Sequence, residues 1–195
     1  MTRAVKVLGM RNIITASIIL VGVHSVAHAD NPFFGSGHQN QISVNFGHGT
    51  DANWLLPFPG KRVHFSLYDF KYSQPNTFFR LPGRQNINIA YTHGWQNDER
   101  WQWKDYSVPM FYLSEDVALY WTSKWYFGTG MGIGMQLQEN ERVGTKLIFG
   151  FKVFAGRRLS ENWTMEFFMQ HFSNGSTARE NYSYNFYGLG VGYSF

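Results

Sequence analysis

Hydrophobic and polar residues alternate along much of the chain beyond residue 40, and the pattern is strictest near residue 195. One set of alternate positions there is large and apolar, and the other is nearly bare: Tyr187, Leu189, Val191, Tyr193 and Phe195 alternate with Gly188, Gly190, Gly192 and Ser194. Successive side chains of a β-strand point to opposite faces of the sheet. The segment therefore predicts a strand whose apolar face meets either lipid or a second sheet.

Eight alternating segments follow one another, separated by polar or Gly/Pro-rich breaks. They are residues 41–49, 62–73, 85–95, 105–113, 118–135, 146–156, 163–174 and 182–195. About ten residues is the length that a tilted strand needs to cross a membrane. An even number of strands, with no helix-period segment left over, predicts an all-β fold, an eight-stranded antiparallel transmembrane β-barrel. The stretch 54–60 holds two prolines and a glycine, and we expect it to be a loop.

The choice between lipid and a soluble β-sandwich rests on glycine and aromatic residues. Bare positions relieve crowding inside a narrow eight-stranded barrel. Aromatic residues make up 18% of the chain and suit the two girdles of a membrane barrel. The aromatic Phe195, with alternate apolar residues before it, resembles the C-terminal signal of bacterial outer-membrane proteins. This resemblance implies the outer-membrane barrel assembly machinery as a partner.

The first residues have the pattern of a secretory signal peptide. Arg3, Lys6 and Arg11 precede an apolar run, and Ala27-His28-Ala29 then forms an A-x-A cleavage site. The apolar run is too short to span a bilayer as a helix. We therefore expect residues 1–29 to be a signal peptide. Residues 30–195 would then form the barrel domain, in the outer membrane of a Gram-negative bacterium.

Charge and composition exclude several classes of function. The formal net charge is +4, but three of the cations lie in the predicted signal peptide, which leaves +1. A nucleic-acid partner is not expected, because such proteins carry a basic stripe. The chain has no cysteine, so no disulfide holds it together. Four histidines lack the spacing of metal ligands and are expected in loops or the lumen: His38, His48, His64 and His93. Neither a metal nor a cofactor is expected.

The seventh segment carries candidate chemistry on its apolar face. Met165, Phe167 and Met169 share that face with His171 and Ser173. The other face carries the carboxylate and the amides, so it should line the barrel interior. His171 and Ser173 would then point outward, where polar side chains are costly unless they serve a purpose. Residues i and i+2 on a strand lie about 6.6 Å apart on one face, a gap that an imidazole can close.

A serine nucleophile needs a base, and the base needs a third group that fixes its tautomer. The eighth segment is the hairpin partner of the seventh, and Asn185 lies on its apolar face. We therefore predict a triad of Ser173 as nucleophile, His171 as general base and then acid, and Asn185 as orienting group. The loop from Asn174 to Asn181 offers donors for the oxyanion. These are backbone N–H groups near Asn174 and Gly175 and the side chain of Asn181.

The segment His171-Phe172-Ser173-Asn174-Gly175 resembles the His-x-Ser-Asn motif of lipid A 3-O-deacylases of the PagL family. Those proteins are small eight-stranded outer-membrane barrels with the motif on the penultimate strand. The resemblance extends to a glycine-rich strand, here Gly128, Gly130, Gly132 and Gly134. It implies an esterase that removes the 3-O-linked acyl chain of lipid A in lipopolysaccharide. It also implies a serine-histidine mechanism, with Asn181 matching the family's oxyanion asparagine.

The motif departs from that family at two places. The family usually continues Ser-Asn-Ala-Gly, and its third triad member is a glutamate fourteen residues after the histidine, where this chain has Asn185. At both places this chain resembles outer-membrane phospholipase A. That enzyme has the motif His-x-Ser-Asn-Gly and an asparagine fourteen residues after the histidine. It is twelve-stranded and uses calcium at a dimer interface. A phospholipid substrate and a homodimer are therefore alternatives, and a non-catalytic structural barrel is a third reading.

Charged residues elsewhere receive structural interpretations. The stretches Asp98-Glu99-Arg100 and Glu139-Asn140-Glu141-Arg142 are expected to be solvated loop charges. Binding of the cations that bridge lipopolysaccharide phosphates is the alternative for both. Glu166, Gln170 and Lys152 are expected to join an interior polar network.

Overall fold

The computed structural model describes residues 31–34, 37–38, 40–49, 63–98, 101–105, 107–122, 124–140, 142–179 and 181–195. The side chains of residues 63, 64, 95–98 and 101–105 are outside this description. The predicted signal peptide, its cleavage site and the predicted loop 54–60 also lie outside the described residues. Within the described part of the chain, no helix is long and apolar enough to cross a membrane.

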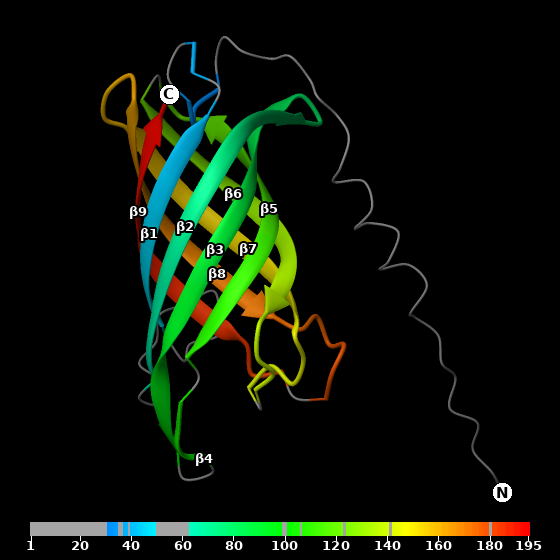
Figure 1. Ribbon diagram of the computed structural model, residues 1–195. Coiled ribbons are helices and arrows are strands. Elements are labelled where there is room, and N and C mark those ends of the chain that lie inside the picture. Colours follow the sequence, from blue (N-terminus) through cyan, green and yellow to red (C-terminus); the bar gives the residue numbers. More distant parts are fainter. Residues whose placement is uncertain are drawn as a thin grey trace, which may run out of the picture.

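The described residues form nine strands, eight of which close into an antiparallel barrel (Figure 1). The strands are β1 Gln41–Gly49, β2 Val63–Phe78, β3 Leu81–Asp98, β4 Trp101–Asp105, β5 Val108–Tyr120, β6 Trp125–Gln136, β7 Leu147–Arg158, β8 Trp163–Ser173 and β9 Tyr184–Ser194. Their order is β2-β1-β9-β8-β7-β6-β5-β3, and pairing of β2 with β3 closes the ring. The predicted eight-stranded barrel is confirmed.

Three details of the strand prediction were wrong. We expected a break at 74–84, but β2 runs to Phe78 and β3 begins at Leu81, which leaves only a turn at 79–80. We expected a break at 114–117, but β5 continues to Tyr120 and the turn lies at 121–124. The polar residues near Asp116 belong to the strand, because Asp116 points inward and pairs with Arg84 at 2.8 Å. The short strand β4 was not predicted. It pairs with β3 and extends that hairpin past the barrel wall (Figure 1).

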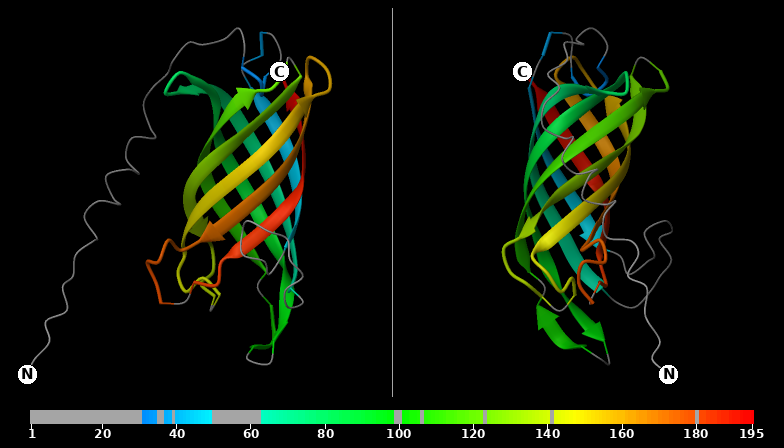
Figure 2. Two further views of the ribbon diagram at one scale, coloured as in Figure 1. Left: turned by 180° about the vertical axis from the view of Figure 1, so that it is seen from behind. Right: turned by 90° about the vertical axis from the view of Figure 1, so that its right-hand side faces the viewer.

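The two ends of the barrel differ in the length of their connections (Figure 2). Turns at 79–80, 121–124 and 159–162 lie at the end that also holds Phe195. The opposite end holds the longer connections 137–146 and 174–183, together with β4. In outer-membrane barrels the short turns are periplasmic and the long loops are extracellular. By that rule, the long-loop end is expected to be extracellular.

The outer surface is apolar in a way that suits lipid. Inward and outward positions alternate strictly along β1, where Val44 is 64% exposed. Ile89 on β3 and Met131 on β6 are similarly exposed, at 61% and 66%. A soluble monomer rarely exposes so large an apolar patch. Exposed tryptophans at the short-turn end suit the aromatic girdle of a membrane interface: Trp121, Trp125 and Trp163.

The interior is a network of buried ion pairs. Arg84 on β3 contacts Asp116 on β5 and Glu166 on β8, each at 2.8 Å. Lys152 on β7 contacts Glu166 at 3.1 Å, and Lys71 on β2 lies 3.7 Å from Asp116. The predicted interior roles of Glu166 and Lys152 are confirmed, and Gln170 is also buried. Charges removed from water need such pairing.

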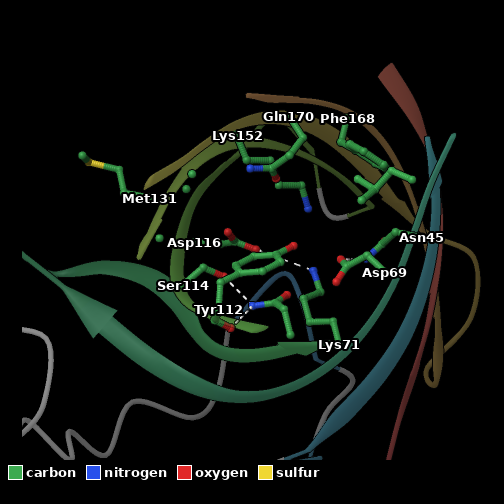
Figure 3. A pocket seen from close by; sticks show the side chains of 15 residues that line it. Asn45, Asp69, Lys71, Tyr112, Ser114, Asp116, Met131, Lys152, Phe168 and Gln170 are labelled. Atoms are coloured by element: carbon green, nitrogen blue, oxygen red, sulfur yellow. Dashed lines mark hydrogen bonds and ion pairs between the residues drawn. The ribbon is translucent and has the colours of Figure 1, made fainter. Parts of the chain in front are cut away.

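A polar cavity of about 20 Å³ lies within this network (Figure 3). Asp69 and Asp116 line it from opposite sides, and Lys71 faces Lys152 and Gln170 across it. Glycines of β6 and β7 form part of its wall. The cavity is enclosed by side chains that point inward, so it is separated by the barrel wall from outward-facing residues of the same strands.

The segment 31–34 enters the barrel at its short-turn end. Phe33 is fully buried, and its ring lies 4.0 Å below the Arg84 guanidinium. The Phe33 carbonyl accepts a hydrogen bond of 2.7 Å from Gln41 Nε2, and Asn31 Nδ2 donates to the Gly83 carbonyl at 2.7 Å. This segment fills the end of the lumen, as the narrow interior of an eight-stranded barrel requires.

Candidate functional site

His171 and Ser173 are the last two outward-facing residues of β8, at the long-loop end of the barrel. Burial alternates along the strand so that Phe168, Gln170 and Phe172 point into the barrel. His171 and Ser173 take the outward positions, as the sequence predicts, and both are half-buried. The pair therefore faces the lipid side of the wall and not the interior cavity.

The imidazole of His171 is held by the neighbouring strand. His171 and Asn185 are directly opposed in the β8–β9 ladder, and His171 Nδ1 lies 2.7 Å from Asn185 Oδ1. The other end of that amide, Asn185 Nδ2, donates to Ser183 Oγ at 3.3 Å. Because Oδ1 can only accept, His171 Nδ1 carries the proton. His171 Nε2 is then free to accept a proton, which is the requirement for a general base.

Ser173 is the next outward-facing residue of β8 after His171. Its Oγ accepts a hydrogen bond of 3.4 Å from the Gly175 N–H. Both Ser173 and His171 are in the described part of the chain, and no hydrogen bond joins them there. Nucleophile–base bonds commonly tighten only when substrate is bound. The arrangement thus has the base and its orienting group in contact, with the nucleophile on the adjacent outward position.

The side chain of Asn174 is buried in the loop and does not reach the lipid-facing wall. The residue is fully buried, and its Nδ2 donates to the carbonyls of Val143 at 2.6 Å and Ala178 at 3.4 Å. Its Oδ1 accepts from the Ser176 N–H at 2.8 Å. Asn174 therefore folds the loop that follows the nucleophile, and its amide is not available to an oxyanion.

Gly175 and Asn181 are the donors that remain near the nucleophile. Gly175 has a φ of +60°, a conformation that favours glycine, and an added Cβ would lie 2.8 Å from the Phe149 ring. Its N–H points at the nucleophile oxygen. Asn181 is exposed, and its Oδ1 accepts from the Asn174 N–H at 3.3 Å. That bond orients the amide of Asn181 and leaves its NH₂ group as the donor.

A second loop supports the site, and the sequence did not reveal it. Arg142 was predicted to be a solvated charge, but it is buried. Its Nε donates to the Ser183 carbonyl at 2.6 Å, and its guanidinium lies 5.0 Å from the Phe65 ring. The Arg142 carbonyl accepts from the Tyr182 N–H at 2.8 Å. The 137–146 loop thus holds the backbone beside Asn185, a contact with no signal in the local sequence. Glu139 is exposed, and Asp98-Glu99-Arg100 lies outside the residues whose side chains are described.

Two of the histidines that were expected in loops or the lumen lie elsewhere. His48 on β1 and His93 on β3 are exposed on the outer wall, because both fall on outward positions of their strands. His38 accompanies Asn162 at the short-turn end, at 3.1 Å, and the His64 side chain is outside the description. Among the described residues, no group of three or more histidine, aspartate or glutamate side chains could hold a metal ion.

Comparison with known proteins places the chain in a family. The family model described as lipid A 3-O-deacylase (PagL) matches residues 79–194. The chain belongs to this family. Membership and the barrel fold together support a lipid A deacylase-type enzyme of the outer membrane, an ester hydrolase. The comparison with curated proteins found no match.

Solved structures are similar to this member of the PagL family, and the first of them shares its fold. The crystal structure of the outer membrane enzyme PagL is 13% identical, with a TM-score of 0.55, and the match covers 80% of this chain and 99% of that one. The solution structure of outer membrane protein H from P. aeruginosa is 16% identical, with a TM-score of 0.48 over 80% and 99% of the two chains. A de novo designed transmembrane β-barrel is 9% identical, with a TM-score of 0.48 over 81% and 96%.

Proposed function

We propose that this protein hydrolyses the 3-O-linked acyl ester of lipid A with Ser173, His171 and Asn185 as its catalytic triad. The observation that carries the proposal is the 2.7 Å contact between His171 Nδ1 and Asn185 Oδ1 on the lipid-facing wall beside Ser173. A polar trio on a lipid-facing surface is costly without a purpose. Acyl-ester cleavage uses all three groups.

The proposed reaction has two halves. His171 Nε2 takes the proton of Ser173 as Oγ bonds to the ester carbonyl carbon, and the carbonyl oxygen becomes an oxyanion. The Gly175 N–H and the Asn181 amide NH₂ donate to that oxygen. His171 then protonates the departing sugar oxygen, and the bond between that oxygen and the carbonyl carbon breaks. A water molecule, activated by His171, releases the fatty acid from Ser173.

The position of the site supports an outer-leaflet substrate. His171 and Ser173 lie at the long-loop end, which is extracellular in outer-membrane barrels. Lipid A occupies the outer leaflet there. Under this proposal residues 1–29 are cleaved as a signal peptide and the assembly machinery inserts the barrel. The homodimer stays a prediction.

Mass spectrometry of lipid A tests the substrate. Cells that produce the protein should yield lipid A that has lost one hydroxyacyl chain, compared with cells that carry the empty vector. The purified protein should release fatty acid from pure lipopolysaccharide. Unchanged lipid A, together with fatty acid release from phospholipid vesicles, would instead establish the phospholipase alternative, which the asparagine at position 185 favours.

Changes at position 185 test the orienting role. Asn185→Asp should retain or raise kcat, because a carboxylate accepts from His171 Nδ1 and also stabilises the imidazolium. Asn185→Leu should lower kcat by up to about 10⁴-fold, since the base then loses its fixed tautomer. Initial rates on a soluble nitrophenyl ester measure both variants. Equal rates for Asn185→Leu and the wild type would exclude the role.

A further inference from the structure

The outer wall at the long-loop end is chemically divided, and the candidate site lies at the boundary. From Ser173 the ladder leads to Phe149 on β7, then Ile133 on β6 and Leu113 on β5. From His171 it leads to Phe151 and Met131. These five outward side chains are apolar, and Figure 3 shows Met131 pointing away from the interior. The His171 row then meets the half-buried Glu115 on β5.

The wall on the other side of the site carries polar residues, in a row that starts one outward position along β9 from Asn185. A single row of opposed residues crosses four strands there and ends at the residue just before β5. In ladder order from β9 to the start of β5, the row is Tyr187, His48, Ser66, His93 and Ser107. Each member lies on the outward face and is exposed or half-buried. This polar row begins beside the site, because Tyr187 follows Asn185 on the same face of β9.

Side chains at the two ends of the polar row are in contact. The rings of His48 and Tyr187 meet edge to face, with centroids 5.7 Å apart. His93 Nδ1 lies 2.9 Å from Ser107 Oγ, and the His93 ring stacks on Tyr91 at 6.1 Å. The row below, toward the short-turn end, is again apolar or aromatic: Leu189, Phe46, Tyr68 and Tyr91. Imidazole and serine side chains are therefore confined to the first of these two rows, and the second carries only aliphatic and aromatic ones.

We propose that the polar row binds the sugar-phosphate head of the lipid while the apolar row receives the acyl chain that is cut. The inference rests on the proposed function and fixes the direction in which the substrate lies. An ester bond joins a polar head to an apolar chain, so it belongs where the two surfaces meet. Imidazole, phenol and hydroxyl groups hydrogen-bond sugar hydroxyls and phosphate oxygens, and the hydrocarbon covers Phe149, Ile133 and Met131.

The head side is tested by selectivity. His48→Phe removes a polar group from the row and keeps an exposed ring. It should lower the ratio of kcat/KM on lipid A to kcat/KM on a headless nitrophenyl ester by about tenfold, the effect of one lost hydrogen bond, mainly through KM. The matched control is Val44→Phe on the same strand and face, 64% exposed in the wild type. The control should keep the wild-type ratio, and an unchanged ratio in His48→Phe would overturn the head assignment.

The acyl side is tested by chain length. Ile133→Trp should shift the preferred nitrophenyl ester toward shorter chains, because the indole occupies the wall beyond Phe149. Ile89→Trp, on the exposed outer face of β3, is the control and should keep the wild-type profile. The same profile in Ile133→Trp as in the wild type would refute the acyl assignment.

Binding separates this inference from the proposed function. Lipid A binding is measured by titration in the inactive Ser173→Ala background, with and without His48→Phe. Weaker binding in the double variant supports the head assignment whether or not the wild type cleaves lipid A. Equal binding overturns the head assignment even when cleavage by Ser173 is established.

Discussion

Ser173→Ala is expected to lower ester hydrolysis by about 10⁴- to 10⁶-fold while the barrel still forms. The substitution removes the only atom that can bond to the acyl carbon, and the oxyanion donors and substrate binding then supply what activity remains. His171→Asn should have an effect of similar size, because nucleophile and base act as a unit. The double variant should therefore be no slower than either single one.

The measurement is the rate of fatty acid release from lipopolysaccharide by purified protein. Barrel formation is checked by the mobility shift of unheated samples on gel electrophoresis. Ser176→Ala is the matched control, since Ser176 lies three residues along the loop with an exposed side chain. It should keep the wild-type rate. Full activity in Ser173→Ala would exclude the serine mechanism and leave the barrel with a different catalyst or none.

Glu166→Gln is expected to be the most destabilising conservative change in the interior. Six buried charges balance within the described strands: Lys71, Arg84, Lys152, Asp69, Asp116 and Glu166. Glu166 contacts two of the cations, Arg84 at 2.8 Å and Lys152 at 3.1 Å. Its removal leaves three cations against two anions, and breaking a buried pair in this way costs about 3–5 kcal/mol.

Denaturant titration of the refolded barrel measures the change in free energy of unfolding. Glu161→Gln, at an exposed position in the turn before β8, should change it by less than about 0.5 kcal/mol. Adding Arg84→Met to Glu166→Gln restores the balance of charge and should recover part of the loss. A loss below about 1 kcal/mol in Glu166→Gln would show that the network does not depend on this carboxylate.

The same variants separate stability from chemistry. Glu166 lies on the inward face of β8, and His171 lies on the outward face of the same strand. A folded Glu166→Gln barrel should therefore keep a catalytic rate close to that of the wild type, whereas a folded Ser173→Ala barrel should not.

The sequence by itself determined the eight barrel strands apart from their bounds, their two faces and the His171–Ser173 pair, because these follow from alternation with a period of two within one strand. It also determined Asn185, since consecutive strands of an antiparallel barrel are neighbours. The tertiary structure alone decided where β5 ends, because Ser114 and Asp116 are explained by inward partners on β3, such as Arg84 for Asp116. It also decided that Arg142 is buried and that the polar row runs from Tyr187 to Ser107. Those features depend on register and closure among strands far apart in sequence, which no local pattern encodes.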